Sequence, residues 1–320
     1  MVLTVEPAPY FTEVARDAPG ARPVWLRAGD GTRIRAIDWA ADLPDRRGTL
    51  FLFQGRTEYI EKYSDAALEL SRRGYATAAL DWRGQGLSDR KGQTHMIGHV
   101  SDFSEFQSDV DAILAHGAAL ELPRPWHVLG HSMGGPIALR ALHRRTEFRS
   151  AVFSAPMWGL PLPPGRRLLA WLASFGAVTL GLGRRETPGS GKVADPVAAP
   201  FEGNLLTTDP EMFDWMKRII TAHPELALGT PSLGWLWGAL REMLVLSREA
   251  APDVPCLTLL GSDEEIVDMD AIHVRLASWP GSHLEWIEGA RHEPLMEGAV
   301  LRGRLYDRIA AHCAGEKLLS

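Results

Sequence analysis

The chain has 320 residues, of which 45% are hydrophobic and 23% are charged, and its formal net charge is −6. These values are typical of a globular protein and exclude a disordered or low-complexity chain. The mild acidity, without any long run of Lys and Arg, excludes a dominant role in nucleic-acid binding. The length suits one large domain or two modest ones.

The N-terminal residues and the cysteines bear on where the protein works. Residues 1–20 mix charges with prolines and lack the apolar core of a signal peptide, so we expect a cytoplasmic location. The cysteines, Cys256 and Cys313, are too few for a disulfide framework and lack the close Cys/His pairing of a zinc site. We expect both to be small buried side chains. The uncharged stretch Leu168–Gly183 is shorter than the roughly 18 residues of a membrane span. Bracketed by arginine pairs, it is either a buried helix or one that contacts a lipid surface.

Apolar runs of strand length alternate with helical patterns through the first half. The expected strands are Arg33–Trp39, Thr49–Gln54, Tyr75–Leu80, Trp126–Gly130 and Ser150–Ala155. The expected helices are Glu58–Arg73, Ser101–Gly117 and Ser132–Arg145. This alternation predicts an α/β fold, with a mostly parallel central sheet and helices on both faces.

The alternation stops after Met157. From Leu160 to Glu249 there are Pro/Gly clusters, helical stretches and no convincing strand, and five of the 11 tryptophans lie in or beside this segment. The alternation then resumes with strand Cys256–Leu260, helix Met269–Ala277, strand His283–Glu288 and helix Gly298–Cys313. We therefore predict a catalytic core made of residues 1–159 and 251–320, with residues 160–250 inserted as a helical cap.

The sequence from Gly130 to Gly134 fits the pattern G-x-S-x-G, with Ser132 at its centre. It follows an apolar strand and opens a helix, which is the setting of a nucleophile elbow. There the serine is held in a strained backbone conformation with its Oγ above the sheet, and glycines prevent collisions on either side. The alternative is that Ser132 merely caps a helix after a Gly-rich turn.

A serine nucleophile needs a base that is itself oriented by a carboxylate. An acidic loop, residues 263–268, follows the strand at Cys256–Leu260, at the sheet edge where α/β folds place active sites. His292 follows the last strand and fits the base, because His273 lies within a helix and His283 begins a strand. A merely solvated acidic loop remains the alternative for residues 263–268.

The oxyanion formed during acyl transfer needs two backbone N–H donors. One is expected from Met133, the residue after the nucleophile. The other is expected from Arg56, in the loop after the strand Thr49–Gln54, where Gly55 would let the backbone approach the substrate. An ordinary turn is the alternative for this loop.

These residues stand within longer stretches that resemble the lysophospholipase and monoacylglycerol lipase group of α/β hydrolases, along most of the chain. The matching stretches are QGRTEYIEKY, ALDWRGQGLSDR, HMIGHVSDFSEFQSDV, LGHSMGG, FSAPMWG and EGARHEPLMEG. The resemblance implies an α/β-hydrolase core with an inserted cap, no metal or organic cofactor, and hydrolysis of single-chain acyl esters.

The chain departs from the family pattern at two places. Many relatives have His-Gly where this chain has Gln54-Gly55, which keeps the backbone donor but changes the polar support of the loop. The family's acid position corresponds to Glu264, with Asp263 as the alternative. Asp81 precedes Ser132, so we expect it to order its own loop rather than to serve the triad.

The expected triad is thus Ser132, Glu264 and His292, and the expected substrate is a lysophospholipid or a monoacylglycerol. A general carboxylesterase acting on small soluble esters, a haloperoxidase-like hydrolase and a non-catalytic scaffold remain alternatives. The tryptophans of the cap either line an acyl site or pack cap against core. The stretch Leu168–Gly183 could bring the protein into peripheral contact with the inner membrane surface.

Overall fold

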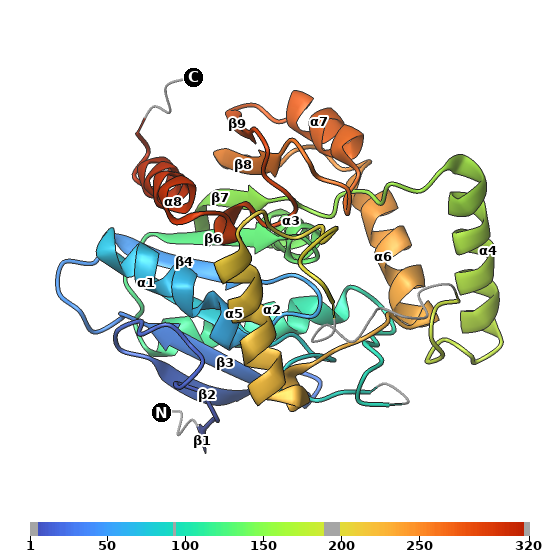
Figure 1. Cartoon of the computed structure of the whole chain (residues 1–320), viewed down its shortest axis with the longest axis horizontal. Coiled ribbons are helices and arrows are strands. Elements are labelled where there is room, and N and C mark those ends of the chain that lie inside the picture. Colours follow the sequence, from blue (N-terminus) through green and yellow to red (C-terminus); the bar gives the residue numbers. More distant parts are fainter. Residues whose placement is uncertain (1–5, 92–93, 189–198, 317–320) are drawn as a thin grey trace.

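The computed structural model describes residues 6–91, 94–188 and 199–316. Its centre is a nine-stranded sheet within those residues, in the order β1-β2-β3-β5-β4-β6-β7-β8-β9 (Figure 1). The strands are β1 (Glu6–Pro7), β2 (Arg22–Arg27), β3 (Arg33–Trp39), β4 (Gly48–Phe53), β5 (Tyr75–Leu80), β6 (Trp126–His131), β7 (Phe148–Ser154), β8 (Cys256–Gly261) and β9 (Ser282–Ile287). From β5 to β9 all neighbours are parallel, whereas β1, β2 and β3 pair antiparallel at one edge.

Helices cover both faces of the sheet. The α-helices are α1 (Ser64–Arg72), α2 (Glu105–Ala119), α3 (Gly134–Arg144), α4 (Pro164–Thr179), α5 (Pro210–Ala222), α6 (Leu233–Leu246), α7 (Met269–Ala277) and α8 (Ala299–Cys313). Among the described residues there are also three short 3-10 helices, η1 (Ile60–Tyr63), η2 (Pro224–Leu226) and η3 (Pro294–Met296). Side chains of α2, α3 and α7 belong to one core layer, and those of α1 and α8 belong to the other.

Strand β4 shows how the sequence builds the two layers. Successive strand residues point to opposite faces of a sheet. Accordingly Phe51 and Phe53 pack with α2 and α3, whereas Leu50 and Leu52 pack with α1 and α8. All four side chains are fully buried, which explains why the strand reads as a continuous apolar run.

The predicted fold class is confirmed, and each predicted strand lies within two residues of its observed bounds. The prediction missed β1 and β2, whose sequences do not alternate clearly between apolar and polar residues. The helix predicted from Glu58 starts later, as η1 followed by α1, because Tyr59 has an extended backbone. The helix predicted from Ser101 begins at Glu105, and the one predicted from Ser132 begins at Gly134.

Between β7 and β8 the chain forms α4, α5, η2 and α6. Helix α6 packs on α3, and α4 packs on α6 at the outer edge of the molecule (Figure 1). Within the described part of this segment there is no strand, only isolated bridges of Glu186, Pro231 and Ser232. None of the described helices combines the length and apolarity needed to cross a membrane.

Candidate active site

Ser132 occupies the tight turn between β6 and α3. Its φ of 49° lies in the left-handed region, which is unusual for a serine and indicates local strain. The turn is held by Ser132 N–H donating to Ser154 O at 3.1 Å, and by Ser132 O accepting from the N–H groups of Gly135 and Met157. A Cβ at Gly134 would lie 1.9 Å from Phe53 O, so this position requires glycine. The turn is therefore an elbow between strand and helix.

A chain of hydrogen bonds joins Ser132, His292 and Glu264. His292 Nε2 lies 3.0 Å from Ser132 Oγ, and His292 Nδ1 lies 2.8 Å from Glu264 Oε2. Glu264 and His292 are buried, each with 4% of its surface exposed, whereas Ser132 is partly exposed. Of the three side chains, the serine is thus the one most open to a substrate.

Glu264 is fixed from its other side as well. Its Oε1 accepts from the N–H groups of Ile266 at 2.6 Å and Val267 at 3.0 Å. Burial alone would raise the pKa of Glu264, but the bonds from His292 and from these two N–H groups hold the pKa below its usual value. Glu264 therefore stays a carboxylate at neutral pH and can accept a hydrogen bond from the His292 imidazole.

The other candidates for acid and base lie elsewhere. Asp263 is exposed and accepts a bond from Ser262 Oγ at 2.9 Å. Among the alternative histidines, the ring of His273 lies 6.1 Å from that of Trp286, and His283 Nε2 lies 3.1 Å from Arg308 Nη2. Glu264 and His292 are the pair that the fold brings to Ser132.

The backbone N–H groups of Arg56 and Met133 are left without an acceptor among the described residues. Gly55 N–H donates to Glu58 Oε2, and Thr57 N–H donates to Gln85 Oε1 at 3.3 Å. Between them, no described residue accepts from the N–H of Arg56, and the same holds for Met133. Arg56 and Met133 line one small cavity, so two backbone N–H groups without an acceptor there suit an incoming oxygen.

Gly55 also has close neighbours within the protein. A Cβ there would lie 3.0 Å from Glu58 Oε2 and 3.2 Å from His131 Cδ2, so a larger residue would press on this carboxylate and this imidazole.

A buried ionic cluster, which sequence analysis missed, lies behind the triad. Lys62 Nζ contacts one oxygen of Glu58 and one of Glu293, and Tyr63 Oη donates to Glu58 at 2.8 Å. Burial opposes ionisation, but Lys62 and His131 hold the pKa of Glu58 down at about 2. The pair Glu58–Lys62 has i,i+4 spacing and could have been noticed, but its link to Glu293 depends on the fold. The cluster connects the loop of Arg56 to the loop of His292.

This cluster also contains a set of possible metal ligands. Atoms of Glu58, His131 and Glu293 lie within 4.8 Å of one another. The Lys62 ammonium already contacts both carboxylates. Positive charge is therefore supplied by the chain itself, and the arrangement does not fit a further cation.

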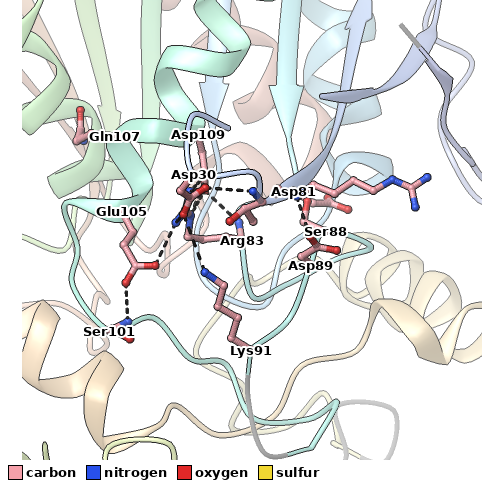
Figure 2. Close-up of polar contacts among 12 residues, drawn as sticks. Asp30, Asp81, Arg83, Ser88, Asp89, Lys91, Ser101, Glu105, Gln107 and Asp109 are labelled. Carbon is pink, nitrogen blue, oxygen red and sulfur yellow. Dashed lines mark hydrogen bonds and ion pairs between the residues drawn. The ribbon is translucent and has the colours of Figure 1, made fainter. Parts of the chain in front are cut away.

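The loop after β5 holds the loop that contains Arg56 in place. Arg83 pairs with Asp30 at 2.8 Å, Glu105 at 3.0 Å and Asp109 at 2.7 Å, as Figure 2 shows. From the same loop, Gln85 Nε2 donates to Gly55 O at 2.9 Å. Arg83 thereby fixes the loop that carries Gln85. The Gln85 amide in turn binds the backbone of Gly55 and of Thr57, the two neighbours of Arg56.

Asp81 orders these loops, as expected. Its carboxylate accepts from Ile60 N–H at 2.9 Å and Leu87 N–H at 2.8 Å, and it pairs with Arg35 at 2.7 Å. The Gln54 side chain donates to Leu80 O. It therefore links the ends of β4 and β5.

The tryptophans of the inserted segment mostly pack helix against helix. Trp171 and Trp237 meet edge to face at 5.2 Å, which joins α4 to α6. Trp215 donates to Val14 O at 2.8 Å and so joins α5 to the N-terminal segment, while Trp158 packs on Phe153. Trp235 lines a small cavity together with Arg56 and Met133. Of the five, it is the one that this structure places near the candidate oxyanion donors.

A wider cavity of about 410 Å³ opens at the opposite edge of the sheet, lined by residues such as Pro125, Ser150 and His312. These residues lie near the starts of β6 and β7 and in α8, away from the carboxyl ends that carry Ser132. We assign it no part in the chemistry. Cys256 and Cys313 are both free and buried, as expected.

Comparison with known proteins gives the following relatives. The profile of a hydrolase family described as serine aminopeptidase, S33, matches residues 44–299. A probable lysophospholipase L2 of Haemophilus influenzae is 31% identical over 255 residues, covering 78% of this chain and 79% of that protein. Lysophospholipase L2 of Escherichia coli K12 is 28% identical and covers 85% of this chain and 82% of that protein. A monoglyceride lipase of Rattus norvegicus is 27% identical, covering 77% of this chain and 75% of that protein.

The fold also has solved counterparts. A soluble variant of monoglyceride lipase from Saccharomyces cerevisiae, in complex with a substrate analog, superposes with a TM-score of 0.72 at 19% identity. That match covers 97% of this chain and 100% of the other. At this level of identity the likeness concerns the fold.

Proposed function

This chain belongs to the family described as serine aminopeptidase, S33, and on that premise we propose that it is a serine hydrolase of carboxylic esters. Its substrates in this proposal are single-chain acyl lipids, either lysophospholipids or monoacylglycerols. The observation that carries the proposal is the hydrogen-bonded series Ser132–His292–Glu264 beside two free N–H groups. The names of the relatives, lysophospholipase L2 and monoglyceride lipase, support the substrate class.

In the proposed mechanism Ser132 Oγ attacks the ester carbonyl carbon as its proton passes to His292 Nε2, 3.0 Å away. Glu264 fixes the imidazole tautomer and stabilises the imidazolium. The oxyanion accepts from the N–H groups of Arg56 and Met133. The glycerol or glycerophospho group leaves with the proton of His292, and water then releases the fatty acid from the acyl-enzyme.

We further propose that residues 160–250 act as a cap whose α4 contacts a lipid surface. Four large apolar side chains of α4 are half or more exposed: Leu168 (60%), Leu169 (66%), Leu172 (60%) and Phe175 (50%). The arginine pairs at 166–167 and 184–185, which flank this stretch, are exposed as well. An apolar face flanked by cations is typical of a helix that lies on an anionic membrane. Such contact would bring the site to its substrate.

The proposal is tested by measuring fatty-acid release from lysophosphatidylcholine, from monoacylglycerol and from p-nitrophenyl esters of increasing chain length. We expect the wild type to hydrolyse at least one of the two lipids and to prefer long acyl chains. Ser132→Ala should keep the melting temperature and lose about 10³-fold or more of the activity, because no nucleophile remains. A wild type that cleaves short esters and neither lipid would contradict the lipid substrate and support a general carboxylesterase.

A further inference from the structure

The side chain of Arg56 is an inward-facing cation with few partners. Its Nη2 donates to Gly229 O at 2.6 Å, while its buried Nε has no partner. No carboxylate of the described residues pairs with it, in contrast to Arg35 and Arg83, which pair with two and three carboxylates respectively. Arg90, which also lacks a carboxylate, donates to four carbonyl oxygens. Arg56 is therefore left with unused donors and an uncompensated charge.

This cation lies beside the candidate oxyanion donors. Arg56 and Met133 line one small cavity, together with Leu228 and Trp235 of the inserted segment. The guanidinium carbon lies 5.5 Å from the centre of the Trp235 ring. Opposite it, a Cβ at Gly98 would come within 3.0 Å of Nη2, so the glycine leaves room for the guanidinium. The charge is thus held between the Arg56 loop, α6 and the segment around residue 98.

Burial without a counter-charge is unfavourable for a cation. It lowers the pKa of Arg56 to about 10, which still leaves the group charged at neutral pH. An anion placed against the unused N–H groups would remove this cost, and the planar guanidinium fork matches phosphate oxygens well.

We propose that Arg56 binds the phosphate of a lysophospholipid and thereby favours lysophospholipids over monoacylglycerols. This inference rests on the proposed function. The ester and the phosphate of such a lipid are attached to the same three-carbon glycerol. The proposal places the ester oxygen at the N–H groups of Arg56 and Met133, and the phosphate, a few bonds along the same glycerol, against the Arg56 guanidinium. A monoacylglycerol presents a neutral hydroxyl group there and gains less from the guanidinium.

The test compares kcat/KM for lysophosphatidylcholine and for monoacylglycerol of equal chain length, both presented in the same neutral detergent micelles. The full chain is used as wild type, Arg56→Gln, Arg56→Lys and Arg218→Gln. Arg218 is an exposed arginine of α5 and controls for general attraction of charge. Arg56→Gln should lower the ratio of the two kcat/KM values about 10-fold to 100-fold, as expected for loss of a charged hydrogen bond. Arg56→Lys should lower it less, since lysine keeps the charge but not the fork, and Arg218→Gln should leave it unchanged.

Equal losses on both substrates in Arg56→Gln would overturn the inference and make Arg56 a support of the loop. An equal change of the ratio in Arg218→Gln would do so as well. A wild type that cleaves monoacylglycerol and not lysophospholipid contradicts this inference alone, whereas one that cleaves neither contradicts the proposed function.

A measurement on the wild type keeps the test valid if the variants fail to fold. Glycerol 3-phosphate should inhibit monoacylglycerol hydrolysis more strongly than glycerol at equal concentration. Equal inhibition would count against a phosphate site at Arg56.

Discussion

At the scale of single residues, neighbours in sequence have very different surroundings. Glu264 is buried between His292 and two backbone N–H groups, while Asp263, one residue earlier, is exposed and bonds to Ser262. The backbone turn after β8 thus selects which carboxylate faces the imidazole. The family pattern predicted Glu264 with Asp263 as the alternative, and the fold brings the Glu264 carboxylate to His292.

We therefore expect Glu264→Gln to lower kcat about 10⁴-fold, because an amide at this position favours the wrong tautomer of His292. Asp263→Asn changes a solvated side chain and should stay within about 3-fold of the wild type. The measurement is esterase activity on one p-nitrophenyl ester at pH 7.5. A larger loss in Asp263→Asn would show that the acid has been assigned one residue too late.

At the scale of secondary-structure elements, α4 differs from the other helices in where its apolar side chains lie. Leu168 and Leu172 fall on one face at i and i+4, and each is 60% exposed. The inner face carries Trp171 and Phe175, also at i and i+4, and both contact Trp237 of α6. The helix therefore has one side for packing on the protein and another side available to lipid.

We expect the exposed apolar face of α4 to bind vesicles that contain anionic lipid. Leu168→Asp and Leu172→Asp should reduce the protein recovered with such vesicles in a flotation assay, because each change places a charge in the apolar layer. Val300→Asp is the matched control, since Val300 is an apolar residue of α8 that is 93% exposed. Equal recovery of all three variants and the wild type would exclude α4 as the contact.

The elements also show which parts of the fold can be predicted from sequence. Buried parallel strands such as β4 and β6 were found because their apolar runs are continuous and end in turn-forming residues. The motif around Ser132 is local, so its position between strand and helix was predictable too. The antiparallel strand β2 and the packing of Trp215 on Val14 depend on distant contacts, for which the local sequence carries no periodic signal.

At the scale of the whole molecule, the site is held together by contacts between distant parts of the chain. Lys62 forms ion pairs with Glu58, in the loop after β4, and with Glu293, in the loop after β9. These residues contribute to one buried cluster behind the triad. The loop of the oxyanion donors and the loop of His292 are thereby fixed relative to each other.

Lys62→Met should destabilise the fold by about 3–5 kcal/mol at pH 7.5, because it leaves two buried carboxylates without a cation. In the wild type the pKa of Glu58 is lowered to about 2, from a value of 4.5 in the unfolded chain. The ionised Glu58 therefore contributes fully to the stability of the fold above pH 4.5, and this contribution is lost as the pH falls towards 2. Without Lys62, the burial that raises the pKa of Glu58 loses its main opposing charge, and the variant should gain stability as Glu58 becomes protonated on mild acidification.

Urea unfolding at pH 7.5 and pH 5 gives the free energy of unfolding of the variant and of the wild type. We expect the difference between the two free energies to be smaller at pH 5. The control is Arg72→Met, which breaks an exposed pair with Glu69 and should cost less than about 1 kcal/mol at either pH. A Lys62→Met penalty independent of pH would indicate lost packing rather than unpaired charge.

In the proposed mechanism Ser132 is the nucleophile of a lipid ester hydrolase. This role is tested by treating the protein with a long-chain alkyl fluorophosphonate and measuring intact mass, modified peptide and remaining hydrolysis of a single-chain lipid together. We expect one phosphonate per chain, located on Ser132, with activity falling in proportion to labelling. A fully labelled protein that still releases fatty acid, or a label on another residue, would contradict it.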